Sequence, residues 1–356
     1  MYDVVIIGAG PAGATLAARL DKKLKVLILD KRSLDKPSGG IVKCCGGLLA
    51  PDAQQMLAHL GRGIPKDILT GPQLFTVRTI DLDNDLERYY QRHYINVDRE
   101  RLDRWFNTFI PDHVRRVYDA HFKNFKRVKD GYILKYTQYG KVYEVEAQMI
   151  VGADGAFSTV RKQLEKHHPH KQPEVYASIE EWFKVSQTTP YFTTIFDREV
   201  TDFYSWTIPK GDYLILGSAI PKGQEINKKF KLLKSKLTKR GYELEECSKR
   251  QGAIINRPMH LNQISIGQEN VFLIGEAAGF ISPSSAEGFS YAFRSSLALA
   301  KSINGRREDI EKEYHHYLKK LYANILFKNL KAPFMYNKLL RKIVMTTGVL
   351  SMDIDD

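Results

Sequence analysis

The chain has 356 residues, more than one ordinary domain, and 43% of them are hydrophobic, enough for a well-formed core. Lys and Arg number 54 against 41 Asp and Glu, so the formal net charge is +13. Three cysteines are too few for a disulfide framework, and the absence of a run of ~20 apolar residues excludes a transmembrane helix. The first residues lack a signal-peptide pattern, so we expect a cytoplasmic protein.

The chain opens with a predicted strand, a glycine-rich turn and a helix. Residues 4–7 are Val or Ile, the turn at 8–13 reads Gly-Ala-Gly-Pro-Ala-Gly, and the helix is expected to reach Leu20. Gly8 would permit the tight turn, Gly10 would let a pyrophosphate approach the backbone, and Gly13 would allow close helix–strand packing. The helix N-terminus would add free N–H groups and a positive dipole end.

A second predicted strand, residues 25–29, ends at Asp30. A carboxylate at this point would accept hydrogen bonds from both ribose hydroxyls of an adenosine. A purely structural turn is the alternative, but the strand before it, the helix after it and this acid together favour a dinucleotide site. These residues alone leave NAD and FAD as alternatives.

Further strands and one helix follow. We expect paired strands at 74–80 and 87–95, a helix at 96–109, and a hairpin at 132–136 and 142–147. A strand at 149–151 then leads into Gly-Ala-Asp-Gly, and another at 271–274 leads into Gly-Glu-Ala-Ala-Gly. Each of these turns would let a backbone approach a ligand closely.

The stretch from 174 to 250 alternates apolar and polar residues in strands, for example at 175–184 and 191–196, and ends in a lysine-rich helix. Such a sheet would cover the face of a cofactor and build a substrate cavity.

The C-terminal region is basic and amphipathic. Residues 314–343 contain Lys and Arg but no Asp or Glu, interleaved with Leu, Ile and Phe. The pattern is typical either of helices packed on the core with solvated lysines or of an element that binds an anionic membrane surface. In the second case we expect salt-sensitive binding, with Phe327, Leu330 or Phe334 inserted. Nucleic-acid binding is not expected, because no nucleic-acid module accompanies the charge.

The three glycine turns, in this order, resemble those of the FAD-dependent oxidoreductases that share the fold of the aromatic hydroxylases. The resemblance implies non-covalent FAD, with Asp154 near the pyrophosphate. It also implies that Gly275 and Glu276 hold the ribityl chain, although the family usually has Asp at the second place. The helix that begins near 285–288 would point its N-terminus at the pyrimidine edge of the flavin.

The same resemblance implies an arginine on FAD at the start of the helix at 96–109. Arg99 is preferred to Arg101 and Arg104, because its spacing from Asn96 and the presence of Asp103 match the family pattern. An exposed arginine is the alternative. The expected cofactor contacts are Gly8, Gly10, Ala12, Gly13, Asp30, Lys31, Arg99, Asp154, Gly275, Glu276, Gly279 and Gly288.

Two further stretches resemble the geranylgeranyl reductase family, and most closely its bacterial CbrA-like branch. Residues 204–209 read Tyr-Ser-Trp-Thr-Ile-Pro with glycines at 211 and 217, and residues 43–51 read Lys-Cys-Cys-Gly-Gly-Leu-Leu-Ala-Pro. The resemblance extends to about residue 300. It implies that reduced FAD saturates isolated carbon–carbon double bonds of polyprenyl chains, with Cys45 beside the flavin.

A thiol at Cys45 could protonate one carbon atom while hydride reaches its neighbour. A buried small residue is the alternative, and the side chain of Cys44 is expected to point elsewhere. Tyr204, Trp206 and Ile208 would share one face of a strand. They would line an apolar substrate tunnel or, equally, form a core face of the sheet.

Together these patterns predict an α/β fold, with a doubly wound, three-layer FAD-binding domain of the aromatic-hydroxylase type and an antiparallel-sheet substrate domain interleaved with it. The expected boundaries are 1–73, 96–170 and 255–305 for the FAD-binding domain, 74–95 and 171–254 for the substrate domain, and 306–356 for a basic helical C-terminal extension.

The leading functional interpretation is a reductase of prenyl double bonds with a lipid-like substrate. A flavin hydroxylase that uses NAD(P)H and oxygen, and a non-catalytic flavoprotein at the inner face of the membrane, are the alternatives. The electron donor is left open between NAD(P)H and a reduced protein carrier. No metal site is expected, because the histidines within 167–170 lie in a polar loop.

Overall fold

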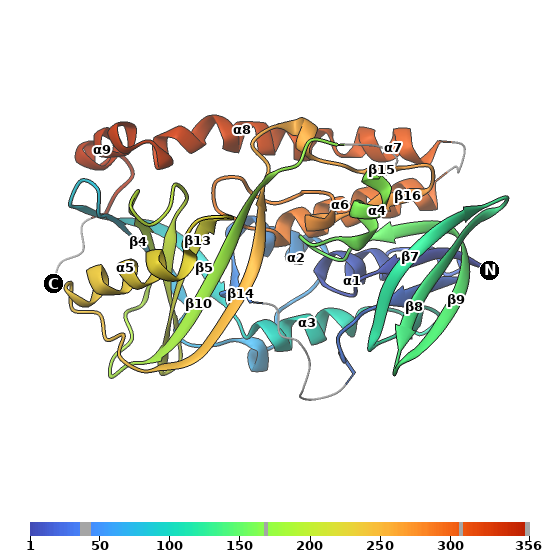
Figure 1. The fold of residues 1–356 in the computed structure, drawn as a ribbon, viewed down its shortest axis with the longest axis horizontal. Helices are drawn as coiled ribbons and strands as arrows, with labels where there is room; N and C mark the ends of the chain where they lie inside the picture. Colours follow the sequence, from blue (N-terminus) through green and yellow to red (C-terminus); the bar gives the residue numbers. More distant parts are fainter. Residues whose placement is uncertain (36–43, 167–169, 306–308, 353–356) are drawn as a thin grey trace. The chain divides into compact units, whose positions relative to one another are not determined.

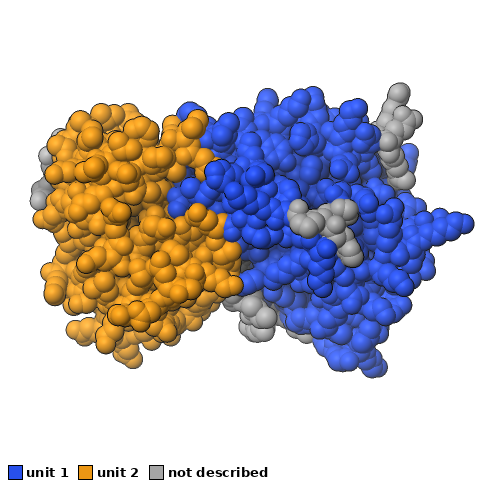
Figure 2. Space-filling model, turned by 45° about the horizontal axis from the view of Figure 1, so that its top comes forward, with its two compact units in different colours: residues 1–42, 100–173, 256–328 blue, residues 43–99, 174–255, 329–356 orange. Residues whose placement is uncertain are grey.

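The computed structural model describes residues 1–35, 44–166, 170–305 and 309–352. They form two compact units, which have different colours in Figure 2. Unit 1 comprises residues 1–42, 100–173 and 256–328, and unit 2 comprises residues 43–99, 174–255 and 329–356. This division differs from the expected boundaries, because residues 43–73 group with unit 2 and the C-terminal extension is split between the units.

Unit 1 contains an eight-stranded sheet (Figure 1). Its strands are β1 (Tyr2–Ile7), β2 (Val26–Leu29), β6 (Arg115–Val117), β7 (Ala120–Val128), β8 (Gly131–Gln138), β9 (Lys141–Gly152), β15 (Gly267–Gln268) and β16 (Val271–Leu273). The order is β15-β16-β9-β1-β2-β6, and β8 pairs with both β7 and β9. The pairs from β16 to β6 are parallel, and β2 is buried throughout, as expected for a strand covered on both faces.

The helices of unit 1 pack on this sheet and on one another. They are α1 (Pro11–Ala17), α3 (Arg99–Asn107, in unit 1 from residue 100), α4 (Thr159–Glu165), α6 (Phe289–Asn304) and α7 (Ile310–Tyr317), with 3₁₀ turns at Leu261–Gln263 and Gly275–Ala277. The small residues of α1 allow close contact with α6, where the Ser296 hydroxyl donates to the Ala12 carbonyl at 2.7 Å.

Unit 2 contains a second eight-stranded sheet. Its strands are β3 (Leu48–Leu49), β4 (Leu74–Asp81), β5 (Leu86–Asn96), β10 (Glu174–Lys184), β11 (Tyr191–Phe196), β12 (Ser205–Lys210), β13 (Tyr213–Pro221) and β14 (Cys247–Arg257), in the order β14-β10-β13-β12-β11-β4-β5-β3. Helix α2 (Pro51–His59) and a 3₁₀ turn (Lys66–Ile68) lie between β3 and β4 in the chain. β11 and β4 are parallel, whereas β10 with β13, β12 with β11 and β13, and β5 with β3 and β4 are antiparallel.

One face of the unit 2 sheet is covered by the lysine-rich helix α5 (Ile226–Thr238). Phe230, Leu233 and Leu237 of α5 are buried in one cluster with Phe183 and Leu216 of the sheet. The apolar stripe of α5 faces the sheet. Lys228 and Lys231 face outward, whereas Lys234 pairs with the buried Glu181 of the sheet, Nζ to Oε2 2.8 Å.

The C-terminal helices are α8 (Lys319–Tyr336), which crosses from unit 1 to unit 2 at residue 329, and α9 (Lys338–Thr347). The guanidinium group of Arg341 attaches α9 to the β4–β5 turn, because it donates to both carboxylate oxygens of Asp81 at 2.8 and 2.9 Å and to Asp83 at 2.6 Å.

The structure confirms the predicted α/β fold with two sheets and a helical C-terminus. The helix expected at 96–109 begins only at Arg99, because Asn96 completes β5. Its side-chain amide donates to the carbonyls of Pro72 and Pro209 and is therefore held in the sheet. The strands expected at 142–147 and 149–151 are one continuous strand, β9. β14 continues to Arg257, beyond residue 250, where the expected strand region ended.

Candidate cofactor and substrate sites

The three glycine turns meet at one edge of the unit 1 sheet. β1, β9 and β16 are parallel neighbours, with Ile7 opposite Gly152 and Gly152 opposite Leu273. Their carboxyl ends therefore bring together the turns that follow them. β1 lies between β2 and β9, so the strand order reverses here, and open α/β sheets bind ligands outside the carboxyl ends at such a point.

Two glycines allow close backbone approaches here, one between turns and one within the first turn. Gly8 has φ +106°, and a Cβ there would lie 2.4 Å from the carbonyl oxygen of Ala153. A Cβ on Gly13 would lie 1.8 Å from the carbonyl oxygen of Gly8. At Gly10, by contrast, the nearest described atom to a Cβ would be Nη2 of Arg32 at 3.8 Å, so the backbone is open on this side.

The carboxylate of Asp30 is buried and already holds four N–H donors of the protein. Oδ2 accepts from the backbone of Ala9 at 2.7 Å and from Nη2 of Arg32 at 3.0 Å. Oδ1 accepts from the backbone N–H of Arg32 at 2.8 Å and from its Nε at 3.0 Å. Because a carboxylate offers about four acceptor positions, the ribose contacts expected here require the guanidinium group to withdraw. Lys31, the neighbouring expected contact, is exposed.

Helix α3 supports the first glycine turn through residues that the sequence did not single out for this role. Arg32 donates to Oδ2 of Asp103 at 2.6 Å, and Nδ2 of Asn107 donates to the carbonyl of Ala9 at 2.9 Å. Burial opposes the charge on Arg32, but the ion pairs with Asp30 and Asp103 outweigh it and raise the pKa of Arg32. Asp103 and Asn107 are four residues apart, a spacing that could have indicated one helix face.

Asp154 stands at the N-terminus of α4. Its Oδ2 accepts from the backbone N–H groups of Thr159 at 2.7 Å and Val160 at 3.3 Å, whereas Oδ1 is buried and has no hydrogen-bond partner among the described residues. Burial raises the pKa of Asp154 above its usual value despite these hydrogen bonds. The carboxylate therefore combines a helix-capping role with one oxygen that a ligand group could satisfy.

Glu276 lies beside glycines of two other segments. Its Oε2 is 3.8 Å from the position of a Cβ on Gly155, and its Oε1 is 3.2 Å from that of a Cβ on Gly288. Gly275 has φ +57° and approaches Ala12, whose Cβ would be 3.1 Å from a Cβ on that glycine. The expected contacts around Glu276 are thus brought together within unit 1.

Gly279 and Gly288, two further expected cofactor contacts, lie beside charged side chains of the protein. A Cβ on Gly279 would lie 3.2 Å from Nη1 of Arg161. Helix α6 begins after Gly288, and the carboxylate of Glu287 accepts from the backbone and the hydroxyl of Ser290 at 2.8 and 2.7 Å. A carboxylate therefore already lies at the N-terminus that we expected to face the flavin.

Arg99 is the first residue of α3 and is buried, with 9% of its surface exposed. It groups with unit 2, whereas Arg104 of the same helix belongs to unit 1. Arg104 donates to Glu100 at 2.7 Å and to the carbonyl of Leu34 at 3.2 Å. These contacts hold the side chain of Arg104 within unit 1.

In unit 2, the expected substrate residues are buried. Tyr204 precedes β12, and its ring centroid lies 5.4 Å from that of Trp206. Trp206, Ile208 and Lys210 alternate along β12 and therefore share the sheet face opposite to the one that α5 covers. Tyr204, Trp206 and Ile208 are 9, 7 and 4% exposed.

A row of three residues crosses this face. Gly217 of β13 pairs with Glu180 on one side and with Trp206 on the other. A Cβ on Gly217 would lie 2.3 Å from Cε2 and 2.4 Å from Nε1 of the indole, so the ring lies across the glycine. The indole thereby reaches Glu180 and forms a side-chain hydrogen bond with it.

The cysteine loop lies on the same row. Sγ of Cys44 donates to Oε2 of Glu180 at 3.2 Å, and a Cβ on Gly46 would lie 2.2 Å from Cδ1 of Ile208. Cys44 is buried and Cys45 is half-buried. Burial raises the pKa of Glu180, although the hydrogen bonds from Cys44 and Trp206 oppose the rise. Lys43, which begins this motif in the sequence, lies outside the described residues.

Lys210 is a buried amine at the end of this face. Nζ donates to the carbonyl oxygens of Gly47 at 3.2 Å and Val97 at 2.7 Å, and to Oδ1 of Asn96. Burial lowers the pKa of Lys210 from 10.5 to about 8, against the opposing influence of Cys45, Asp98 and Glu180. Lys210 lies between the Tyr-Ser-Trp-Thr-Ile-Pro stretch at 204–209 and Gly211, and only the alternation along β12 could have indicated that its side chain turns inward.

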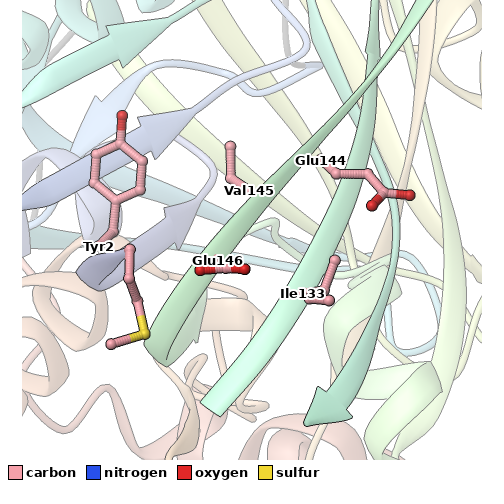
Figure 3. Close-up of a pocket in the computed structure, with 6 residues that line it drawn as sticks. Tyr2, Ile133, Glu144, Val145 and Glu146 are labelled. Atoms are coloured by element: carbon pink, nitrogen blue, oxygen red, sulfur yellow. The ribbon is translucent and has the colours of Figure 1, made fainter. Parts of the chain in front are cut away.

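Two pockets lie elsewhere in unit 1. One, of about 350 Å³, is lined by Met1, Tyr2, Ile133, Glu144, Val145 and Glu146 (Figure 3). The other, of about 830 Å³, is lined in part by His170, Leu261, His315 and Tyr322. None of the expected site residues lines either pocket. His170 contacts the carbonyl of Ile264 at 2.7 Å, while residues 167–169 of the histidine cluster lie outside the described residues.

Comparisons with known proteins agree with this geometry. A family model described as an NAD(P)-binding Rossmann-like domain matches residues 6–40, and one described as an FAD binding domain matches residues 114–316, more than half of the chain. The chain belongs to this FAD-binding family. Protein CbrA of Escherichia coli O157:H7 is 37% identical over 348 residues, which cover 98% of this chain and 97% of CbrA. Protein CbrA of Shigella sonnei matches with the same identity and coverage.

Solved structures of similar fold come from several kinds of flavoprotein. A geranylgeranyl bacteriochlorophyll reductase-like protein from Thermoplasma acidophilum has a TM-score of 0.78 at 16% identity, covering 97% of this chain and 98% of that one. PqsL, a probable FAD-dependent monooxygenase from Pseudomonas aeruginosa, has a TM-score of 0.68 at 17% identity, covering 97% and 99%. The flavin-dependent brominase Bmp2 has a TM-score of 0.70 at 20% identity, covering 97% and 92%. These identities establish the shared fold alone.

The edge of the unit 1 sheet fits the cofactor of the FAD-binding family. The backbone beside Gly10 is open to a phosphate group. The buried Oδ1 of Asp154 has no donor among the described residues, so a group of the cofactor could donate to it. Both features lie at the point of the sheet where dinucleotides bind in doubly wound folds. The cofactor of this protein is therefore FAD.

Proposed function

We propose that this protein is an FAD-dependent reductase of carbon–carbon double bonds in a prenyl or other isoprenoid lipid. The observation that carries the proposal is the packing of the cysteine loop on β12, where Gly46 lies against Ile208 and Cys44 bonds Glu180 next to Trp206. These are the two stretches that resemble the geranylgeranyl reductases. The reductase-like protein of Thermoplasma acidophilum shares the fold that this reaction would use.

The residues of this cluster suit a reaction that needs little electrostatic catalysis. When bound, reduced FAD supplies the hydride. An isolated double bond has no polar handle, so the protein contributes by orientation and by holding a proton near the receiving carbon. Cys45 is half-buried, follows Cys44 on this loop and lies within electrostatic range of Lys210, so its thiol is the proposed proton source. Trp206 and Ile208 supply the apolar surface.

An oxygen-dependent hydroxylase is the second candidate. PqsL, a probable FAD-dependent monooxygenase, covers 97% of this chain at the level of fold, and a protein of that class would take its electrons from NAD(P)H. For the reductase, NAD(P)H and a reduced protein carrier are both retained as donors. A flavoprotein that binds without catalysis is the third candidate.

An anaerobic oxidation experiment tests the proposal. The FAD-loaded protein is reduced with dithionite and mixed with geranylgeranyl diphosphate or longer polyprenyl phosphates, and flavin absorbance and product mass are followed. We expect reoxidation and a product heavier by two hydrogen atoms, and no reoxidation by the fully saturated analogue. Oxygen-dependent consumption of NAD(P)H with a hydroxylated product would instead support the hydroxylase. No turnover under either condition would support the flavoprotein that binds without catalysis.

A further inference from the structure

The C-terminal part of unit 2 presents apolar side chains to its outer surface. Leu330 and Phe334 of α8 are 66 and 52% exposed, and Leu339 and Ile343 of α9 are 69 and 60% exposed. We call these four residues, together with Lys331, Lys338 and Lys342, the α8–α9 patch; Figure 1 labels the two helices that carry it. Large apolar side chains that lie exposed four residues apart on each helix, with lysines beside them, are the kind of surface that marks an interaction site.

The inward face of this segment is held by specific contacts, which decide what points outward. At the end of α8, the ring of Tyr336 lies 5.8 Å from that of Phe196 and 5.1 Å from that of Phe203. On α9, Arg341 forms its buried ion pair with Asp81. These contacts fix α9 and the end of α8 on the core of unit 2.

Helix geometry places the patch opposite these contacts. Leu330 and Phe334 are four residues apart and lie on one stripe of α8, while Leu339 and Ile343 form the corresponding stripe of α9. Asn337 caps α9 by accepting from the backbone N–H groups of Leu339 and Leu340 at 3.0 and 3.2 Å. Helix α9 therefore begins directly after α8, and its apolar stripe follows that of α8 in the chain. An ordinary surface helix is apolar only toward the core, whereas these helices are apolar on the outer side as well.

We propose that the α8–α9 patch docks on the surface of an anionic lipid bilayer. Lysines border the apolar stripes, and residues 314–343 contain no acid that would oppose a negative surface. An apolar face with basic neighbours is typical of interfacial helices, in which the apolar side chains enter the headgroup region and the cations meet anionic lipids. A second copy of the chain is a poorer occupant, because a symmetric contact would set the same lysines against one another.

Docking at the surface also agrees with the length of the helices. Among the described residues, no helix is long and apolar enough to cross a membrane. The proposal does not depend on the reaction at the flavin, because the patch contains none of the residues assigned to the cofactor or to the cysteine cluster.

Vesicle flotation of the full FAD-loaded chain tests the proposal. We expect the protein to float with vesicles that contain phosphatidylglycerol, to float far less in high salt, and to remain unbound with pure phosphatidylcholine. The variant Lys331→Gln, Lys338→Gln, Lys342→Gln should lower the partition coefficient at low salt by up to about 100-fold. The variant Leu330→Ser, Phe334→Ser, Leu339→Ser, Ile343→Ser should abolish the binding that persists in high salt.

A matched variant separates the patch from the net charge. Lys222, Lys231 and Lys239 are exposed in unit 2 outside the patch, so changing all three to Gln removes the same charge. We expect this control to float like the parent, and FAD content and thermal unfolding verify that every variant is folded. Equal loss of binding in both lysine variants, or no binding of the parent to anionic vesicles, would overturn the proposal. A concentration-dependent dimer that the serine variant abolishes, without vesicle binding, would assign the patch to a second copy.

Discussion

The thiol of Cys44 donates a hydrogen bond to the buried carboxylate of Glu180, with Sγ 3.2 Å from Oε2. Glu180 also bonds Trp206 across Gly217, so three segments of unit 2 meet at one carboxyl group. Cys45, the next residue, is half-buried. The two adjacent cysteines thus have different surroundings, and substitutions should distinguish them.

Replacing Cys45 with Ala should leave FAD bound and lower the rate at which substrate reoxidises the reduced flavin. The reason is the proposed loss of a proton source, which contributes typically 10²–10⁴-fold in such reactions. Cys44→Ala is the matched control, and it should instead lower stability, because Glu180 loses a buried donor. Stopped-flow reoxidation measures the rate. Turnover of Cys45→Ala at the parental rate would leave Cys45 with a structural role only.

Glu180→Gln should change how stability depends on pH. Burial raises the pKa of Glu180 above 4.5. At pH values between 4.5 and this raised pKa, the folded protein therefore retains a proton that the unfolded chain releases. The stability that Glu180 contributes is therefore complete below this window and is lost as the pH rises through the raised value. Glutamine cannot ionise, so the unfolding free energy of the variant minus that of the parent should increase from pH 4.5 to 8 in urea titrations.

The exposed Glu174 lies on the same strand and supplies the control for this experiment. Glu174→Gln should give a difference from the parent that stays nearly constant with pH. The same flat profile for Glu180→Gln would show that the carboxyl group of Glu180 is not shielded from water.

Lys210→Met should reveal a pH dependence of opposite sign. Burial lowers the pKa of Lys210 to about 8, so between pH 8 and 10.5 the unfolded chain holds a proton that the folded protein lacks. The contribution of Lys210 to stability therefore rises with pH through this window, by about 3 kcal/mol in all at 1.36 kcal/mol per pH unit. The unfolding free energy of the parent minus that of Lys210→Met should increase between pH 7.5 and 9.5. Lys184→Met, at an exposed position, should show no such trend.

Gly217→Ala should destabilise unit 2 by about 1–3 kcal/mol, the usual penalty for overpacking a buried site. The new methyl group would lie 2.3 Å from Cε2 of Trp206 and would displace the indole from Glu180. Gly63→Ala is the control, because no described atom lies within 4 Å of the added methyl group. Denaturant titration with tryptophan fluorescence measures both. Equal stability of the two variants would contradict this position of the indole.

Glu276→Ala should weaken FAD retention by about 1.5–3 kcal/mol, the worth of a hydrogen bond to a charged group. Asp154→Ala should weaken retention too, and it should also lower stability by about 1 kcal/mol, because the backbone N–H groups of Thr159 and Val160 at the start of α4 lose their acceptor. Released FAD and thermal unfolding distinguish the two effects, with the exposed Glu311→Ala as control. Parental FAD retention in both variants would remove these acids from the cofactor site.

Much of the cofactor half of the fold was predictable because its signals are local. The run of Val and Ile in β1, the glycines after it and the strand that ends at Asp30 all occur within 30 residues, and their backbone preferences do not depend on distant partners. The boundary at Asn96 was wrong for the opposite reason. Its amide bonds Pro72 and Pro209, and contacts over such separations override the helical pattern that follows.

The sequence by itself determined the order of the glycine turns, the Tyr-Ser-Trp-Thr-Ile-Pro strand and the basic C-terminal region. Only the tertiary structure decided that Arg32 occupies the acceptor positions of Asp30, that Cys44 meets a carboxylate 136 residues away, and that Leu330 and Phe334 face outward. The physical reason is that strand register and helix docking choose which side chains become neighbours, and a one-residue shift in register would turn Glu180 and Trp206 to the other face of the sheet.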